Sequence, residues 1–115
     1  MLPPENRFIK KSEFARTRKH GRAYSSGNIE LKIAENRLNK AKIGVVVGLN
    51  FSKKSTERNK AKRWVRDFFR KNLTKIKKST NILVIVKKKD PEKTTKKQIE
   101  NSIEKALEKA GLDKP

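Results

Sequence analysis

Apolar residues recur along this 115-residue chain in the patterns of strands and helices. Residues 28–34 (NIELKIA) alternate apolar and polar side chains, which predicts a strand with one buried face. Residues 42–49 (KIGVVVGL) and 81–86 (NILVIV) are apolar almost throughout, which is typical of strands that are buried on both faces or nearly so. We expect the strand at 81–86 to lie at the centre of the sheet.

Two segments before this central strand are expected to be helical. The first covers residues 13–20, where Ser12 fits an N-cap and Gly21 fits the residue that ends the helix. The second covers residues 56–73 (TERNKAKRWVRDFFRKNL), and Thr56 is its predicted N-cap. A basic loop, NFSKKS, leads into this second helix.

A third helix is expected between residues 95 and 111. Thr95 and Gln98 fit a capping box, and Gly111 fits a C-terminal stop. Its apolar side chains at helical spacing are Ile99, Ile103, Ala106, Leu107 and Ala110. The predicted order is therefore α-β-β-α-β-α, in a single α+β domain over residues 1–115 whose helices pack as a sandwich on a small mixed sheet.

The charge of the chain indicates the class of its partner. Lys and Arg number 32 against 12 Asp and Glu, so the net charge is +20. Such a charge repels itself in a compact protein and is neutralised by a polyanion. Nucleic acid is the first candidate, because phosphate contacts release counterions. An anionic membrane surface is the second candidate, and a merely soluble basic protein is the third.

Composition also excludes several kinds of site. The chain has no cysteine, so it has neither disulfides nor thiolate metal sites. Its longest apolar run, residues 82–86, is much shorter than the roughly 18 residues of a spanning helix, and we expect a cytoplasmic protein. The only histidine, His20, stands beside the expected helix stop, and the carboxylates are scattered. These residues argue against a protein that catalyses a reaction alone.

The helix at 56–73 divides into an apolar face and a basic face when its residues are placed at about 3.6 per turn. The apolar face holds Ala61, Trp64, Val65, Phe68, Phe69 and Leu73. The basic face holds Asn59, Arg63, Arg66 and Arg70, with Arg58 and Lys62 beside them. Guanidinium groups match phosphate oxygens in pairs, so we interpret this face as a surface for nucleic acid rather than a merely solvated one. Phe68 and Phe69 are interpreted as core residues rather than as a platform for stacked bases.

The segment RNKAKRWVRDFFR, residues 58–70, resembles the Arg-Asn-Arg signature helix of the bacterial ribonuclease P protein subunit. The flanking motifs of that family occur in the same order: ENRF near the start, Phe14 followed by KHGR, IGVVVG before SKK, and NILVIV before a terminal amphipathic helix. The resemblance thus covers nearly the whole chain. Two positions differ from the family pattern. Lys60 replaces the second Arg of the signature, and Arg18 stands where relatives often have an aromatic residue.

The resemblance implies a fold, a partner and a reaction. The fold would be the α-β-β-α-β-α sandwich of a ribosomal-protein-like domain, with a left-handed β-α-β crossover. The protein would assist a ribonucleoprotein enzyme that cleaves one phosphodiester to mature the 5′ end of precursor tRNA. The catalytic RNA would do the chemistry with bound Mg²⁺. No residue of the protein would then be catalytic, and no protein partner is evident.

The resemblance also implies two groups of contact residues. Those that would bind the catalytic RNA are Lys53, Lys54, Arg58, Asn59, Lys60, Lys62, Arg63, Arg66 and Arg70. Those that would hold the single-stranded 5′ leader of precursor tRNA are Arg7, Phe14, Arg18 and Lys32. The alternative is a non-catalytic structural RNA-binding protein of ribosomal or nucleoid type, which would share the charge but not the order of motifs.

Overall fold

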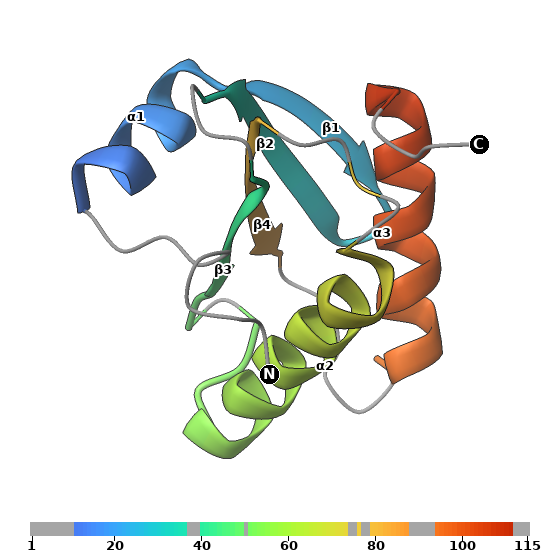
Figure 1. Ribbon diagram of the computed structural model, residues 1–115. Helices are drawn as coiled ribbons and strands as arrows, with labels where there is room; N and C mark the ends of the chain where they lie inside the picture. The colour runs from blue at the N-terminus through green and yellow to red at the C-terminus, as the bar shows by residue number, and fades with distance from the viewer. Residues whose placement is uncertain are drawn as a thin grey trace.

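The computed structural model describes residues 11–36, 40–49, 51–73, 76, 79–87 and 94–111. In this part of the chain a four-stranded sheet carries three helices (Figure 1). The elements are α1 (Lys11–His20), β1 (Arg22–Ser26), β2 (Ile29–Glu35), β3 (Lys42–Val47), α2 (Ser55–Asn72), β4 (Thr80–Val86) and α3 (Lys96–Ala110). The predicted α+β class is confirmed, and the sheet has a strand, β1, that the hydrophobic pattern does not predict.

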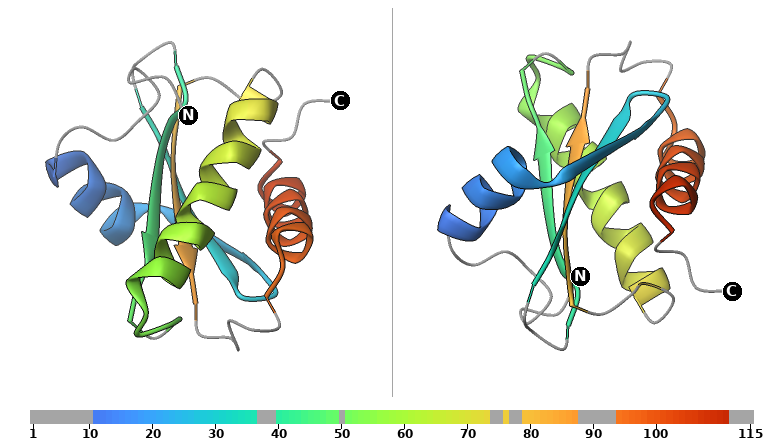
Figure 2. Two further views of the ribbon diagram at one scale, coloured as in Figure 1. Left: turned by 90° about the horizontal axis from the view of Figure 1, so that it is seen from below. Right: turned by 90° about the horizontal axis from the view of Figure 1, so that it is seen from above.

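The strands lie in the order β1-β2-β4-β3, and the sheet is mixed as predicted. β2 pairs antiparallel with both β1 and β4, while β3 and β4 run parallel. A parallel pair needs a crossover, and α2 supplies it. Seen from the side that α2 covers, β3 and β4 both run downwards, β4 ends to the right of β3, and α2 returns in front of them (Figure 2, left). The crossover is therefore left-handed, as the resemblance implies, against the usual right-handed rule.

The sheet separates two layers of helices. α2 and α3 pack against one face and against each other, and α1 crosses the other face (Figure 2). The main core lies between the sheet and the first of these layers. Its fully buried members include Ile29, Leu31, Phe69, Ile82 and Ile103. Burying each such side chain stabilises the fold by roughly 1.5–3 kcal/mol.

The two apolar strands differ in their positions in the sheet. β4 is central, as its continuous apolar run predicts, and only Ile85 is half-buried among its residues. The expectation for β3 is burial on both faces or nearly so, and the structure shows incomplete burial. β3 is an edge strand of the sheet, and Gly44, Val45 and Val46 are half-buried. An apolar run does not reveal whether a strand has a second neighbour.

β1 forms through tertiary contacts rather than through its own pattern. Its sequence, RAYSS, is short and mostly polar, and it has no apolar face to bury. The turn at Gly27, where φ is 57°, folds β1 onto β2 as a hairpin. The Lys109 ammonium of α3 donates to the Ser25 carbonyl at 2.8 Å. A Cβ on Gly27 would lie 2.7 Å from Ser102 Oγ, so glycine lets the hairpin approach α3.

Several predicted helix ends are confirmed. Gly21 follows the last residue of α1, and its amide donates to the Thr17 carbonyl at 2.9 Å. Thr95 and Gln98 form the full capping box at the start of α3. Gly111 ends α3 with φ of 70°, a left-handed conformation that favours glycine.

The other two predicted caps are wrong. Ser12 lies inside α1, which already includes Lys11, so it lacks the non-helical backbone of an N-cap. Thr56 lies inside α2, whose N-cap is Lys54 without a side-chain cap. The amide of Arg58 donates to the Lys54 carbonyl at 3.2 Å, so the helical ladder begins earlier than the cap pattern predicts.

Candidate nucleic-acid interface

α2 attaches to the sheet through its apolar face. Ala61, Val65, Phe68 and Phe69 are buried, and Trp64 and Leu73 are half-buried. The ring centroids of Phe68 and Phe69 lie 5.3 Å apart with an interplanar angle of 87°, which is edge-to-face geometry. The interpretation of both rings as core residues is confirmed, so neither can serve as a platform for a base.

A separate side of α2 carries the predicted basic face, which consists of the amide of Asn59 and the guanidinium groups of Arg63, Arg66 and Arg70, and which we call the α2 stripe. All four side chains are exposed. Within the described residues, neither Arg63 nor Arg66 has an ion pair or a side-chain hydrogen bond. Arg70 Nε lies 3.9 Å from Asp67 Oδ1, and such an exposed pair contributes little. The guanidinium groups of the stripe are therefore not locked to internal acids.

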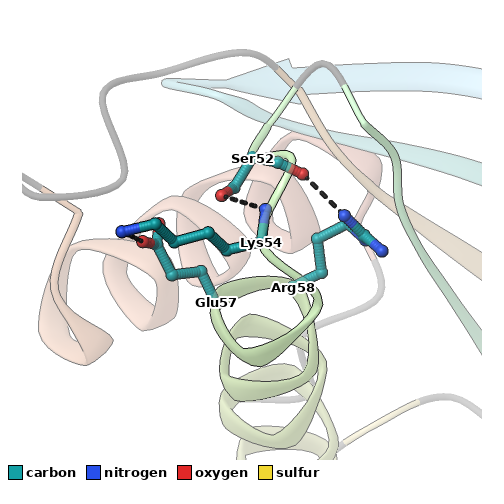
Figure 3. Close-up of polar contacts among 4 residues, drawn as sticks. All are labelled: Ser52, Lys54, Glu57 and Arg58. Carbon is teal, nitrogen blue, oxygen red and sulfur yellow. Dashed lines mark hydrogen bonds and ion pairs between the residues drawn. The ribbon is translucent and has the colours of Figure 1, made fainter.

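The first turn of α2 is tied to the loop before it (Figure 3). Ser52 Oγ accepts a hydrogen bond from the Lys54 amide at 3.1 Å, and Arg58 Nη1 donates to the Ser52 carbonyl at 2.9 Å. Lys54 Nζ lies 3.8 Å from Glu57 Oε1. Arg58 is half-buried and uses one donor within the protein, whereas Lys53 and Lys54 are exposed. The loop is thereby ordered with two cations at the start of the stripe.

Lys60 differs from the other cations of α2 because it lies over an aromatic ring. Its Nζ is 5.2 Å from the centroid of Trp64, within the range of a cation–π contact. Lys60 is exposed, and Lys62, on the other side of the stripe, is half-buried. The ring restrains the Lys60 ammonium, although lysine lacks the planar fork of an arginine.

The predicted leader-binding residues lie on the α1 side of the sheet. Phe14 on α1 is half-buried, and Arg18, one turn later, is exposed. Side chains alternate along a strand, so Lys32 on β2 faces away from the core side to which its neighbour Leu31 belongs. Lys32 is half-buried. Arg7 lies outside the described residues.

A buried polar network fixes α1 on this face of the sheet. Asn81 Nδ2 donates to Thr17 Oγ1 at 3.4 Å, and Asn81 Oδ1 accepts from Asn36 Nδ2 at 2.8 Å. Thr17 is fully buried, so its hydroxyl needs such a partner. A Cβ on Gly21 would collide with the Thr17 carbonyl oxygen, so glycine is required for this close approach. These contacts set the position of α1 and of the side chains that it carries.

The two predicted groups of contact residues lie on opposite faces of the sheet. The α2 stripe belongs to a helix that covers one face, while Phe14 and Arg18 belong to the helix that crosses the other (Figure 2). The structure therefore does not gather them into one site. It presents them on two separate surfaces.

The described residues contain neither a metal-binding cluster nor a membrane-spanning helix. In this part of the chain no group of three or more His, Asp or Glu side chains is placed to hold a metal ion. None of the helices described is long and apolar enough to cross a membrane.

Sequence reasoning missed the surroundings of β1. His20 at the end of α1, Arg22 and Tyr24 on β1, and Glu35 on β2 line a hollow of about 820 Å³. The hairpin register creates this neighbourhood, because it sets Arg22 opposite Ile33 and close to the end of β2. Since β1 has no periodic signal, the sequence alone could not indicate the hollow.

The fold and the sequence both have relatives among known proteins. A sequence model of the family Ribonuclease P matches residues 2–111. The ribonuclease P protein component of Clostridium botulinum (strain Loch Maree / Type A3) is 33% identical over 108 residues, which cover 94% of this chain and 96% of the relative. The RNase P protein of Staphylococcus aureus has a TM-score of 0.84 and 26% identity, covering 94% of this chain and 97% of that one. The RNase P protein of Thermotoga maritima has a TM-score of 0.79 and 29% identity, covering 90% of this chain and 96% of that one.

Proposed function

This chain belongs to the ribonuclease P protein family, and we propose that it serves that enzyme through two RNA-binding surfaces. As a member of the family it is the protein component of a ribonucleoprotein that matures the 5′ end of tRNA, and its partner is RNA. The family match over residues 2–111 sets aside the alternative of a ribosomal or nucleoid protein.

In this proposal the α2 stripe and the cations beside it bind the catalytic RNA. The observation that carries it is the exposure of Arg63 and Arg66 on one helix face, without an acidic partner among the described residues. Because neither guanidinium must leave an internal partner, both offer their full set of donors to phosphate oxygens. Lys53 and Lys54 extend the same surface at the start of the helix.

The α1 side of the sheet is proposed to hold the single-stranded 5′ leader of precursor tRNA. A single strand exposes its bases and its phosphates together. Phe14 offers a ring to a base, while Arg18 and Lys32 offer charge to phosphates. Arg18 can also lie flat on a base, which compensates for the aromatic residue that relatives often have there. Arg7 remains a predicted member of this group.

We also propose that the RNA carries out the cleavage and binds most of the Mg²⁺. The protein contributes charge: its net +20 lowers the repulsion between the catalytic RNA and the precursor. The complex should then assemble at a lower Mg²⁺ concentration than the RNA would need alone.

Processing of precursor tRNA at low Mg²⁺ tests this function. The RNA subunit alone should cleave poorly, and addition of the protein should restore cleavage at the mature 5′ end. The double variant Arg63→Ala/Arg66→Ala should restore much less, while Lys105→Ala, which removes an exposed cation from α3, should act like the native protein. A native protein that binds the RNA without restoring cleavage would contradict the proposal.

A further inference from the structure

We propose that the hollow beside β1 binds a single unstacked guanine ribonucleotide of an RNA strand. The hollow is lined by the end of α1, by β1, by the end of β2 and by the start of β4, with Ala110 of α3 in its wall. Its volume of about 820 Å³ falls within the range of roughly 300–1,000 Å³ of small-ligand sites. None of its lining residues belongs to the α2 stripe or to the leader group. The site would therefore be a third contact, beyond the two surfaces proposed above.

Four side chains of different chemistry line this hollow: an imidazole, a guanidinium, a phenol and a carboxylate, from His20, Arg22, Tyr24 and Glu35. Within the described part of the chain, none of the four has a side-chain hydrogen bond or an ion pair. Arg22 and Glu35 share the hollow without forming a salt bridge with each other. Their donors and acceptors are therefore available to a ligand.

This combination of groups discriminates among classes of ligand. A simple anion would suit Arg22, but Glu35 would repel it. An apolar molecule would cover polar groups without replacing their hydrogen bonds to water, which is costly. A nucleotide suits the side chains of the hollow together, because it carries both a charged phosphate and a polar, aromatic base. Its phosphate pairs with Arg22, and its base lies against the ring of Tyr24.

Glu35 determines which base fits best. A carboxylate accepts two hydrogen bonds side by side. Guanine is the base whose Watson–Crick edge presents two adjacent N–H donors, whereas cytosine presents one amine donor beside an acceptor. That edge is accessible only when the nucleotide is unpaired, which is how proteins usually read RNA sequence. The hollow is therefore suited to a guanine turned out of a loop or a single strand.

The test titrates the full-length protein, in separate samples, with guanosine 5′-monophosphate, cytidine 5′-monophosphate and inorganic phosphate. NMR follows the rings of Tyr24 and His20 and the amide of Arg22. The samples are at roughly physiological ionic strength, because this salt screens weak surface contacts. We expect saturable shifts with the guanine nucleotide. Binding of the cytosine nucleotide should be about tenfold weaker, as for the loss of one base-edge hydrogen bond.

Three variants separate the contributions of the groups. Arg22→Ala should weaken binding of guanosine monophosphate about tenfold, as for loss of a charged phosphate contact. Glu35→Gln should abolish the preference for guanine over cytosine. Arg16→Ala removes an exposed cation of α1 outside the hollow and should change neither property. Because Arg22, Glu35 and Arg16 are all exposed, far-UV circular dichroism should show the same fold in each variant.

Three results would overturn the proposal: no saturable shift at Tyr24, equal affinity for both nucleotides, or equal shifts with inorganic phosphate. The last result would reveal a plain anion site. None of these results bears on the α2 stripe, because its proposed ligand is a folded RNA and its test uses different variants.

Discussion

Replacement of Arg63 and Arg66 of α2 isolates the contribution of the basic stripe. We predict that Arg63→Ala and Arg66→Ala each weaken binding to the RNA component by about 1–3 kcal/mol, or about 5- to 150-fold. Both side chains are exposed and have no partner among the described residues, so each change removes a phosphate contact without breaking an internal one. Arg70→Ala should cost less, because Arg70 already lies 3.9 Å from an oxygen of Asp67.

The salt dependence of RNA binding gives a second quantity that can be predicted, the slope of log affinity against log salt. Each lost phosphate contact lowers the slope of log affinity against log salt by about 0.7–0.9. The double variant Arg63→Ala/Arg66→Ala should therefore lower the slope by about 1.4–1.8. Over a fourfold rise in salt, from about 50 to about 200 mM, the native protein should lose about 7- to 12-fold more affinity than the double variant.

Fluorescence anisotropy of the labelled RNA component, measured at several salt concentrations, gives both the affinity of each variant and its salt slope. Lys105→Ala, at an exposed site on α3, removes the same charge outside the stripe and should change affinity little. Urea unfolding should show all of these variants within about 0.5 kcal/mol of the native protein, since the altered side chains are exposed. Equal losses in the control and in the stripe variants would refute the reasoning, because total charge rather than the stripe would then determine binding.

Three further predictions concern α1 and the charge of the fold. Gly21→Ala should lower the free energy of unfolding by more than about 1 kcal/mol in a urea titration, because the new Cβ would collide with the Thr17 carbonyl. An unchanged free energy of unfolding would show that α1 can shift freely. Phe14→Ala should weaken binding of precursor tRNA to the assembled ribonucleoprotein but not binding of mature tRNA, and an equal effect on both would remove Phe14 from the leader surface. Sulfate should raise the Tm more than chloride at equal ionic strength, because bound anions offset the repulsion of a net charge of +20; identical Tm values would contradict this.

The elements with a strong period could be predicted from the sequence. β4 is an unbroken apolar run, and α3 combines an apolar stripe with a capping box and a glycine stop. The division of α2 into a buried face and an exposed basic face also followed from residue spacing. In each case local propensity and tertiary packing favour the same structure, so the local pattern is sufficient.

The elements that depend on distant contacts could not be predicted in this way. β1 exists because a glycine turn and α3 hold a polar pentapeptide in place. The position of β3 at the edge depends on the strand order, which its apolar residues do not encode. The start of α2 depends on the amide of Arg58 bonding to Lys54, whereas the cap pattern favours Thr56.

The candidate interfaces were predictable to different degrees. The α2 stripe follows from helical geometry, and all four of its side chains are exposed. The contact of Lys60 with Trp64 and the bond of Arg58 to the Ser52 carbonyl required coordinates, because they depend on side-chain direction. The leader group was implied by the family resemblance alone. The hollow beside β1 had no signal in the sequence, because β1 itself lacks the hydrophobic pattern that would predict a strand.

Cleavage of the RNA by a reagent attached to α2 tests the central claim most directly. The chain has no cysteine, so a single introduced cysteine can carry an iron chelate that cuts nearby RNA with hydroxyl radicals. Thr56→Cys places the chelate at an exposed position one turn before Asn59, on the side of the stripe, and Lys105→Cys places it on α3. Our account predicts strong cleavage at a few clustered positions of the RNA component from the first site and little from the second. Equal cleavage from both sites, or stronger cleavage from α3, would contradict it.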